Sequence, residues 1–84
     1  MNEKLDELCE FLNNNNYPDD AARIKEIKVE INTNNRGIAL KRLIAMCNPR
    51  YLGNIIIKEF SNAYEWWNFL GEISEEARDM LNNQ

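Results

Sequence analysis

Two cysteines and a surplus of carboxylates are the residues of this 84-residue chain whose types could carry chemistry. Cys9 and Cys47 could act as nucleophiles or metal ligands, because a thiolate serves in both roles. The sequence contains no histidine, so the commonest general base, zinc nitrogen ligand and partner of a nucleophilic thiol is missing. Two cysteines also fall short of the four ligands of a structural zinc site. We therefore interpret both as buried thiols, rather than as a disulfide or as catalytic groups.

Carboxylates at helical spacing are the second candidate for chemistry. Glu75 and Asp79 stand four residues apart, so a helix would place both on one face, as general acid–base catalysis could use. On an exposed helix end the same spacing is typical of solvated charge. The three glycines are scattered and form no phosphate-binding loop. We predict a protein that is not an enzyme and that uses neither a metal nor a cofactor.

Charge is distributed unevenly along the chain. Residues 1–26 carry seven acids and three bases, residues 27–58 carry six bases and one acid, and residues 59–84 carry six acids and one base. Either these are ordinary solvated faces, or the two acidic ends fold together into one negative patch that would attract a basic partner. The basic middle segment would suit nucleic-acid binding, but nucleic-acid-binding domains are usually basic overall and this chain has a sequence pI near 4.8. We expect no direct nucleic-acid binding.

The elements that must position these groups are mostly helical. Leu5, Leu8, Cys9 and Leu12 fall at i, i+3, i+4 and i+7, which predicts a first helix. The asparagine run 13–16 should end it, because asparagine is a weak helix former that tolerates the left-handed conformation.

A second helix should begin at Pro18, followed by Asp19 and Asp20, whose charges suit a helix start. Residues 24–31 are ambiguous, because Ile24, Ile27 and Ile31 follow a helical period while the stretch IKVEI also alternates like a strand. We favour helix, since a lone strand would lack a partner. A third helix in IALKRLIAMCN should end before Pro49.

An irregular connector with Pro49 and Gly53 should precede the last helix. We expect Gly53 to permit a turn that other residues resist, and residues 54–58 remain open between helix and extended structure. The apolar spacing from Ala63 to Leu81 predicts a helix of about 20 residues with Ser61 as its N-cap. Gly71 could bend that helix, and the SEEA stretch after it could restart a second one.

Trp66 and Trp67 lie about 100° apart on the last helix, so both cannot point into one narrow core seam. We expect one to fill the core beside Leu70 and the other to cover the connector. Two alternatives stay open: both rings are mostly buried, or one exposed ring joins Tyr64 or Tyr51 in a binding surface. The predicted fold is all-α, a compact antiparallel bundle of about four helices in a single domain, residues 1–84.

Nothing in the sequence indicates a membrane. No apolar stretch approaches the ~20 residues that cross a bilayer, and the opening MNEKLDELCE lacks the basic and apolar regions of a signal peptide. We expect a cytoplasmic protein without a membrane partner.

The segment IAMCNPRYLGNI followed by EWWNFLGEI resembles small bacterial immunity proteins encoded beside polymorphic toxins, including those of contact-dependent growth inhibition. The resemblance covers roughly residues 38–81. Related sequences often carry an acid after the glycine of this motif, where this chain has Asn54. If that acid contacts the partner in the relatives, this chain must bind differently.

The resemblance implies a protein that binds a cognate toxin, often a basic nuclease, and occludes its active site or an adjacent site. The alternative is a small cytoplasmic regulatory or adaptor protein that binds nucleic acid or another protein. As partner-binding candidates we take the exposed acids and two tyrosine anchors: Tyr17, Asp19, Asp20, Glu59, Tyr64, Glu65, Glu72, Glu75, Glu76 and Asp79.

Overall fold

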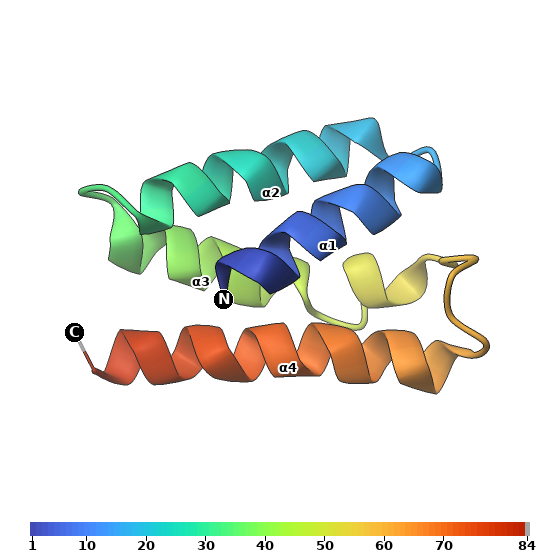
Figure 1. Cartoon of the computed structure of the whole chain (residues 1–84). Helices are drawn as coiled ribbons and strands as arrows, with labels where there is room; N and C mark the ends of the chain where they lie inside the picture. Colours follow the sequence, from blue (N-terminus) through green and yellow to red (C-terminus); the bar gives the residue numbers. More distant parts are fainter. Residues whose placement is uncertain (84) are drawn as a thin grey trace.

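Helices account for all the regular structure in the computed structural model, which describes residues 1–83 (Figure 1). Within those residues there is no strand, so the all-α prediction is confirmed. The elements are α1 (Asn2–Asn14), α2 (Pro18–Ile31), α3 (Arg36–Met46), the short 3₁₀ helix η1 (Leu52–Asn54) and α4 (Ala63–Asn82).

Consecutive helices are neighbours in space. Helices α1 and α2, α2 and α3, and α3 and α4 pack in antiparallel pairs, and α1 crosses in front of the bundle (Figure 1). The short loops that join α1 to α2 and α2 to α3 favour antiparallel neighbours, whereas a longer connector, residues 47–62, joins α3 to α4. The molecule measures 35 × 22 × 21 Å. In this arrangement the N-terminus of α1 lies over α4, although the two segments are far apart in the sequence.

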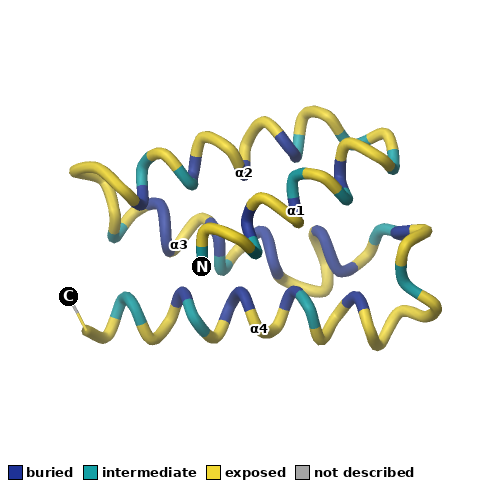
Figure 2. Tube along the Cα trace, viewed as in Figure 1, coloured by how far each residue is buried: buried dark blue, intermediate teal, exposed yellow. Residues whose placement is uncertain are grey.

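The core is a single apolar cluster to which every α-helix contributes one face. Figure 2 shows this for α4, whose buried residues line the side turned toward the other helices. The largest fully enclosed side chains are Trp66, Leu5, Leu8, Leu12, Ile24, Ile27, Leu40, Leu43, Leu52, Leu70 and Ile73. Each such aliphatic side chain contributes about 1.5–3 kcal/mol by leaving water.

Residues 24–31 are helical, as favoured from the sequence. Ile24, Ile27 and Ile31 are buried, whereas Val29 is 60% exposed. A strand would have turned Val29 to the same side as Ile27 and Ile31. The helical period therefore decides which apolar residues reach the core.

The asparagine run ends α1 as predicted. Asn16 adopts a φ of 67°, and no other non-glycine residue among those described has a positive φ. The side chain of Asn15 also bonds across the molecule. Its Nδ2 donates to the Phe11 carbonyl at 2.7 Å, and its Oδ1 accepts the Lys58 backbone N–H at 2.9 Å. This amide holds the end of α1 against the connector.

The start of α4 corrects the predicted cap. Asn62, not Ser61, is the N-cap, because its Oδ1 accepts the Glu65 backbone N–H at 3.0 Å. The Glu65 carboxylate in turn accepts the backbone N–H of Ser61 at 3.1 Å. Helix α4 then runs unbroken from Ala63 to Asn82, which confirms the predicted helix of about 20 residues, and it does not restart after Gly71.

The connector is packed but mostly irregular. After η1, residues 55–58 form neither a helix nor a strand. Gly53 lies in the tight turn of η1 without a positive φ, so this turn does not depend on the left-handed conformation that glycine favours. A Cβ at this position would lie 3.3 Å from the Asn48 carbonyl oxygen and 3.4 Å from the Trp67 indole. A larger residue at position 53 would be crowded by the Asn48 carbonyl and the Trp67 indole.

Candidate partner-binding surface

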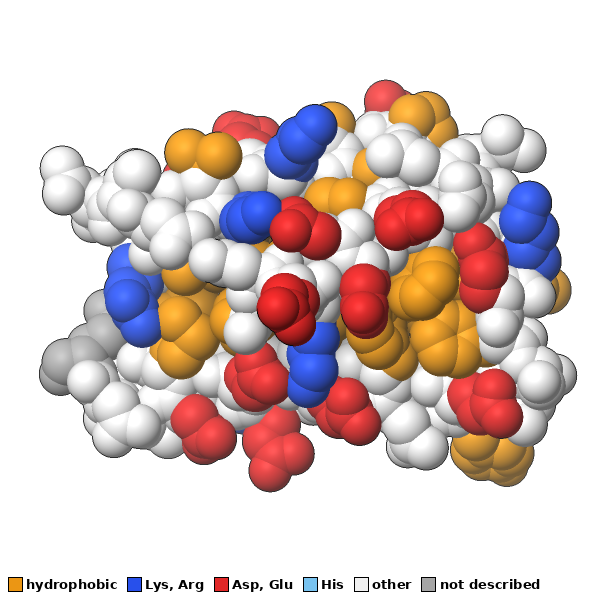
Figure 3. Space-filling view, in the orientation of Figure 1, with side chains coloured by type: hydrophobic (Ala, Val, Ile, Leu, Met, Phe, Trp, Pro, Cys, Tyr) orange, Lys and Arg blue, Asp and Glu red, His pale blue; other side chains and the backbone are white. Residues whose placement is uncertain are grey.

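Acidic side chains of α1 and α4 gather on one face of the molecule (Figure 3). Residues three, four or seven apart share a face of a helix. On α4 that spacing aligns Glu65, Glu72, Glu75, Glu76 and Asp79, and on α1 it aligns Glu3, Glu7 and Glu10. We call these eight residues, together with Glu59, the acidic face. The two acidic ends of the chain therefore meet, as one of the two charge interpretations predicted.

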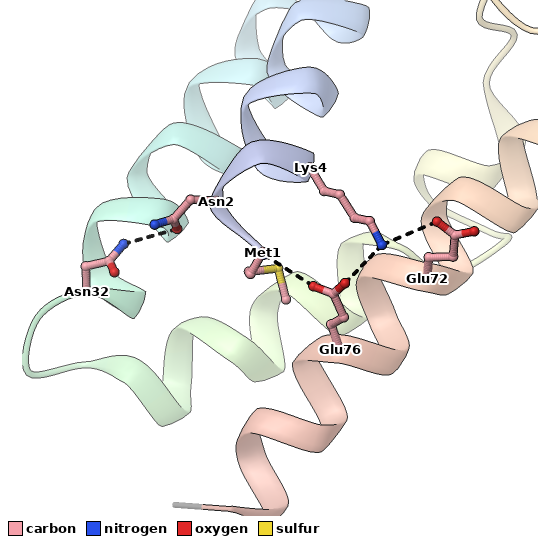
Figure 4. Close-up of polar contacts among 6 residues, drawn as sticks. All are labelled: Met1, Asn2, Lys4, Asn32, Glu72 and Glu76. Atoms are coloured by element: carbon pink, nitrogen blue, oxygen red, sulfur yellow. Dashed lines mark hydrogen bonds and ion pairs between the residues drawn. The ribbon is translucent and has the colours of Figure 1, made fainter.

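Lys4 joins the two helices in the middle of the acidic face (Figure 4). Its Nζ lies 2.9 Å from Glu76 Oε1 and 3.3 Å from Glu72 Oε2, and the N-terminal amine of Met1 lies 3.5 Å from Glu76 Oε2. The hydrogen bond with Lys4 lowers the pKa of Glu76, and the same bond raises the pKa of Lys4. Such exposed pairs add little stability, but they fix the position of α1 over α4.

The same close-up shows how the N-terminus is held from its other side. Asn32, just after α2, donates from Nδ2 to Asn2 Oδ1 at 3.5 Å (Figure 4). Lys28 of α2 pairs with Asp6 of α1. Asp6 is thus engaged with α2 and is not free to meet a partner.

Glu59 extends the acidic face to the other end of α1. Its carboxylate accepts hydrogen bonds from Asn15 Nδ2 at 2.7 Å and Asn14 Nδ2 at 3.3 Å. The bond from Asn15 lowers the pKa of Glu59. Glu59 therefore has a structural role as well as its predicted role in binding.

An aromatic cluster lies between α1 and α4 beside these acids. Phe11 packs edge-on against Phe60 and Phe69, with ring centroids 5.2 and 5.5 Å apart, and Phe69 stacks on Trp66 at 6.0 Å. The three phenylalanines are only partly buried. Acidic residues and an apolar centre are thus combined on one surface, as in many protein interfaces.

Sequence reasoning missed part of this surface. Five of its residues were not among the predicted contact residues: Glu3, Glu7, Glu10, Phe11 and Phe69. The spacing signal was present, because Glu3, Glu7 and Glu10 repeat at four and three residues on the α1 face beside Lys4 and Phe11. The pairing of α1 with α4 across the molecule was not visible in the sequence.

Three predicted residues lie elsewhere. Tyr17, Asp19 and Asp20 stand at the start of α2. Asp20 Oδ1 accepts a hydrogen bond from the Tyr51 hydroxyl at 3.2 Å and lies 3.7 Å from Arg23. Tyr17 is half-buried against the core. The structure does not bring this group to the acidic face.

Tyr64 also departs from the acidic face. Tyr64 is 71% exposed and meets the Trp67 ring edge-on at 5.5 Å. Glu75 is exposed and lies one turn from both Glu72 and Asp79, so it extends the acidic face along the outer surface of α4. The predicted site is therefore divided: Glu59, Glu65, Glu72, Glu75, Glu76 and Asp79 gather, and the other four residues do not.

The two tryptophans take the separate roles that their angle on the helix predicted. Trp66 is buried and its Nε1 donates to the Leu52 carbonyl at 2.8 Å. Trp67 covers the connector, and its Nε1 donates to the Gly53 carbonyl at 2.7 Å. Trp67 is 43% exposed, so the alternative in which both rings are mostly buried is wrong.

The thiols are shielded and unpaired. Cys47 is buried, and this burial raises its pKa to about 12. Burial also raises the pKa of Cys9, which is half-buried and points its Sγ at the Ala21 carbonyl. In residues 1–83, no group of three or more His, Cys, Asp and Glu side chains could hold a metal ion.

Comparison of the chain with protein-family models, with curated proteins and with solved structures found no match. Across the part of the chain that is described, no helix combines the length and apolar character that crossing a membrane requires.

Proposed function

We propose that this chain is an immunity protein that binds a cognate bacterial toxin, a basic nuclease, and occludes its active site or an adjacent site. The observation that carries the proposal is the acidic face, where carboxylates from both ends of the chain gather around an apolar centre. The sequence resemblance to immunity proteins points the same way. The protein performs no catalysis in this mechanism.

Charge complementarity would supply speed and selectivity. A nuclease binds phosphates with a cationic groove, and rows of carboxylates along α1 and α4 present the same sign of charge as a nucleic-acid backbone. Opposite potentials steer the two proteins together and raise the association rate, an effect that salt weakens. Partners with an acidic surface are repelled, which gives selectivity.

Some acids of the face are engaged within the molecule and others are free. Glu72 and Glu76 pair with Lys4, which holds α1 against α4. Glu59 accepts hydrogen bonds from two asparagines, and Glu65 accepts the Ser61 backbone N–H. The remaining acids form no ion pair within residues 1–83 and are exposed, so they are free to meet basic groups of the toxin: Glu3, Glu7, Glu10, Glu75 and Asp79. Phe11 and Phe69 would provide the apolar contact at the centre.

The test is growth rescue combined with co-purification. The C-terminal region of the polypeptide encoded immediately upstream is expressed with and without this chain. We expect toxicity alone, survival with the chain, and a stable complex of the two proteins. No toxicity, or toxicity without rescue and without a complex, would rule out immunity toward that neighbour.

Charge reversals locate the interface. Glu7→Lys and Asp79→Lys change free acids of the face, so the fold should persist while association slows and rescue is lost. Glu26→Lys on α2 is the matched control, because Glu26 is exposed and lies outside the face. Equal rescue by all three variants would contradict the assignment of this surface. Tight, strongly salt-dependent binding of bare RNA would favour the adaptor alternative instead.

A further inference from the structure

A groove of about 310 Å³ lies between α3 and α4, on the other side of α4 from the acidic face. Its apolar lining includes Ile44, Cys47, Trp67 and Leu70. Cys47 and Leu70 are buried, so they form the floor, whereas Trp67 is partly exposed and forms a wall. A volume of this size is at the lower end of the range for ligand pockets, about 300–1,000 Å³.

Two small residues keep the groove open. Gly71 and Ser74 of α4 line it, and a Cβ added at Gly71 would meet no atom within 4 Å. Gly71 lies inside a helix, where glycine costs about 0.5–1 kcal/mol relative to alanine. Glycine at position 71 therefore makes α4 less stable than alanine would, and the missing side chain leaves room in the groove.

The Trp67 wall is held in place before any ligand arrives. Its Nε1 donates to the Gly53 carbonyl at 2.7 Å, and Tyr64 meets the ring edge-on at 5.5 Å. Because the indole N–H already has an acceptor, the ring offers an incoming group its apolar surface. A rigid aromatic wall lowers the entropy cost of binding.

A basic side chain without an ionic partner lines the groove. Arg78 belongs to the lining, and Arg50 follows the lining residue Pro49 in sequence. Within residues 1–83, neither of these two bases forms an ion pair. Arg78 therefore gives the groove a group that complements negative charge.

We propose that this groove binds a short peptide segment of a partner protein, with an apolar or aromatic anchor side chain flanked by carboxylates. The anchor enters between Trp67 and Leu70, and the carboxylates pair with Arg78 and Arg50. The surface differs in position and in charge from the acidic face, so it serves a contact other than that with a basic toxin.

A peptide fits better than a nucleic acid. Buried Cys47 and Leu70 suit an apolar anchor, whereas single strands bind along basic grooves with stacked bases. The Trp67 and Tyr64 rings already pack against each other, and the net charge of −4 on the chain would repel a long polyanion. A short peptide with a few carboxylates meets less of that repulsion.

The probe is an acetylated peptide with a central leucine–phenylalanine pair flanked by aspartates, titrated into the ¹⁵N-labelled chain. We expect the indole N–H signal of Trp67 to shift and that of the buried Trp66 to stay. Control peptides carry lysines in place of the aspartates, or serines in place of the anchor pair. Both controls should bind at least about tenfold more weakly, a difference of about 1.4 kcal/mol.

Variants separate binding from folding. Gly71→Leu should fill the groove and abolish binding, without loss of thermal stability because leucine is the better helix former. Arg78→Glu should weaken binding at least about tenfold, whereas Lys25→Glu, the same change on exposed α2, should not. Equal binding of the lysine-flanked peptide, unchanged binding to Gly71→Leu, no binding of the aspartate peptide, or tighter binding of single-stranded RNA at Trp67 would each overturn the proposal.

Discussion

The indole N–H of Trp66 donates a hydrogen bond to the backbone carbonyl of Leu52 over 2.8 Å, inside the core. The bond links the middle of the chain to the start of α4. Its neighbour Trp67 makes the same kind of bond one residue further along, to Gly53, at the edge of the core. Two adjacent tryptophans thus fix two adjacent carbonyls of the connector, and the exposed ring becomes the wall of the α3–α4 groove.

Trp66→Phe should destabilise the protein more than Trp67→Phe. The first change leaves the buried Leu52 carbonyl without its donor, which costs about 1–3 kcal/mol, in addition to lost packing. The Gly53 carbonyl lies beside a half-exposed ring, so water can replace the lost bond. Urea unfolding followed by far-UV circular dichroism measures the difference. Tyr64→Phe is the control, and equal losses for both tryptophans would contradict the unequal burial.

Asn15→Ala should lower stability by about 1 kcal/mol, the net contribution of a typical hydrogen bond. The change removes the acceptor of the Lys58 N–H and the donor to the Phe11 carbonyl. Asn13→Ala, at an exposed position of the same run, should have little effect. Thermal unfolding of both variants gives the comparison. If the two variants have the same thermal unfolding midpoint, the asparagine run only ends α1 and does not hold the connector.

Acid should weaken the contact between α1 and α4. The Lys4 hydrogen bond lowers the folded-state pKa of Glu76, so this contribution is complete above the ordinary glutamate pKa, about 4.3, and is lost as pH falls through the lowered value. Glu59 behaves likewise through Asn15. We expect the urea midpoint to fall between about pH 5 and 3, and to fall less in Glu76→Gln. An identical acid slope in that variant and in the Glu26→Gln control would refute the linkage.

Cys9 should react with iodoacetamide well before Cys47. Burial raises the pKa of Cys47 to about 12, so its thiolate fraction near pH 8 falls by about three orders of magnitude. Cys9 is half-buried and lies beside a shallow surface pocket with Lys25. Mass spectrometry of timed samples locates the label, and the Cys9→Ser variant isolates Cys47. Faster labelling of Cys47 would mean that the α3–α4 groove opens to its floor.

The helices were predictable because their signals are local. The spacing of Leu5, Leu8 and Leu12 and the asparagines after them define α1, and the exposed Val29 confirms the helical period of α2. The cap of α4 was misplaced by one residue, since Ser61 and Asn62 are both good N-caps and only the φ, ψ of the backbone distinguishes them. Local chemistry therefore predicts that a helix is present more reliably than it predicts the residue at which that helix begins.

The candidate surfaces depended on tertiary structure. The sequence determined that two acidic ends flank a basic middle, and that Trp66 and Trp67 must point in different directions. Only the packing decided that Lys4 lies over Glu72 and Glu76, that Asp20 turns to Tyr51, and that Gly71 leaves a groove beside Arg78. Charge and helical period are properties of residues close together in the sequence, whereas these contacts join segments that are far apart in the chain. Burial of the shared apolar core determines which segments meet.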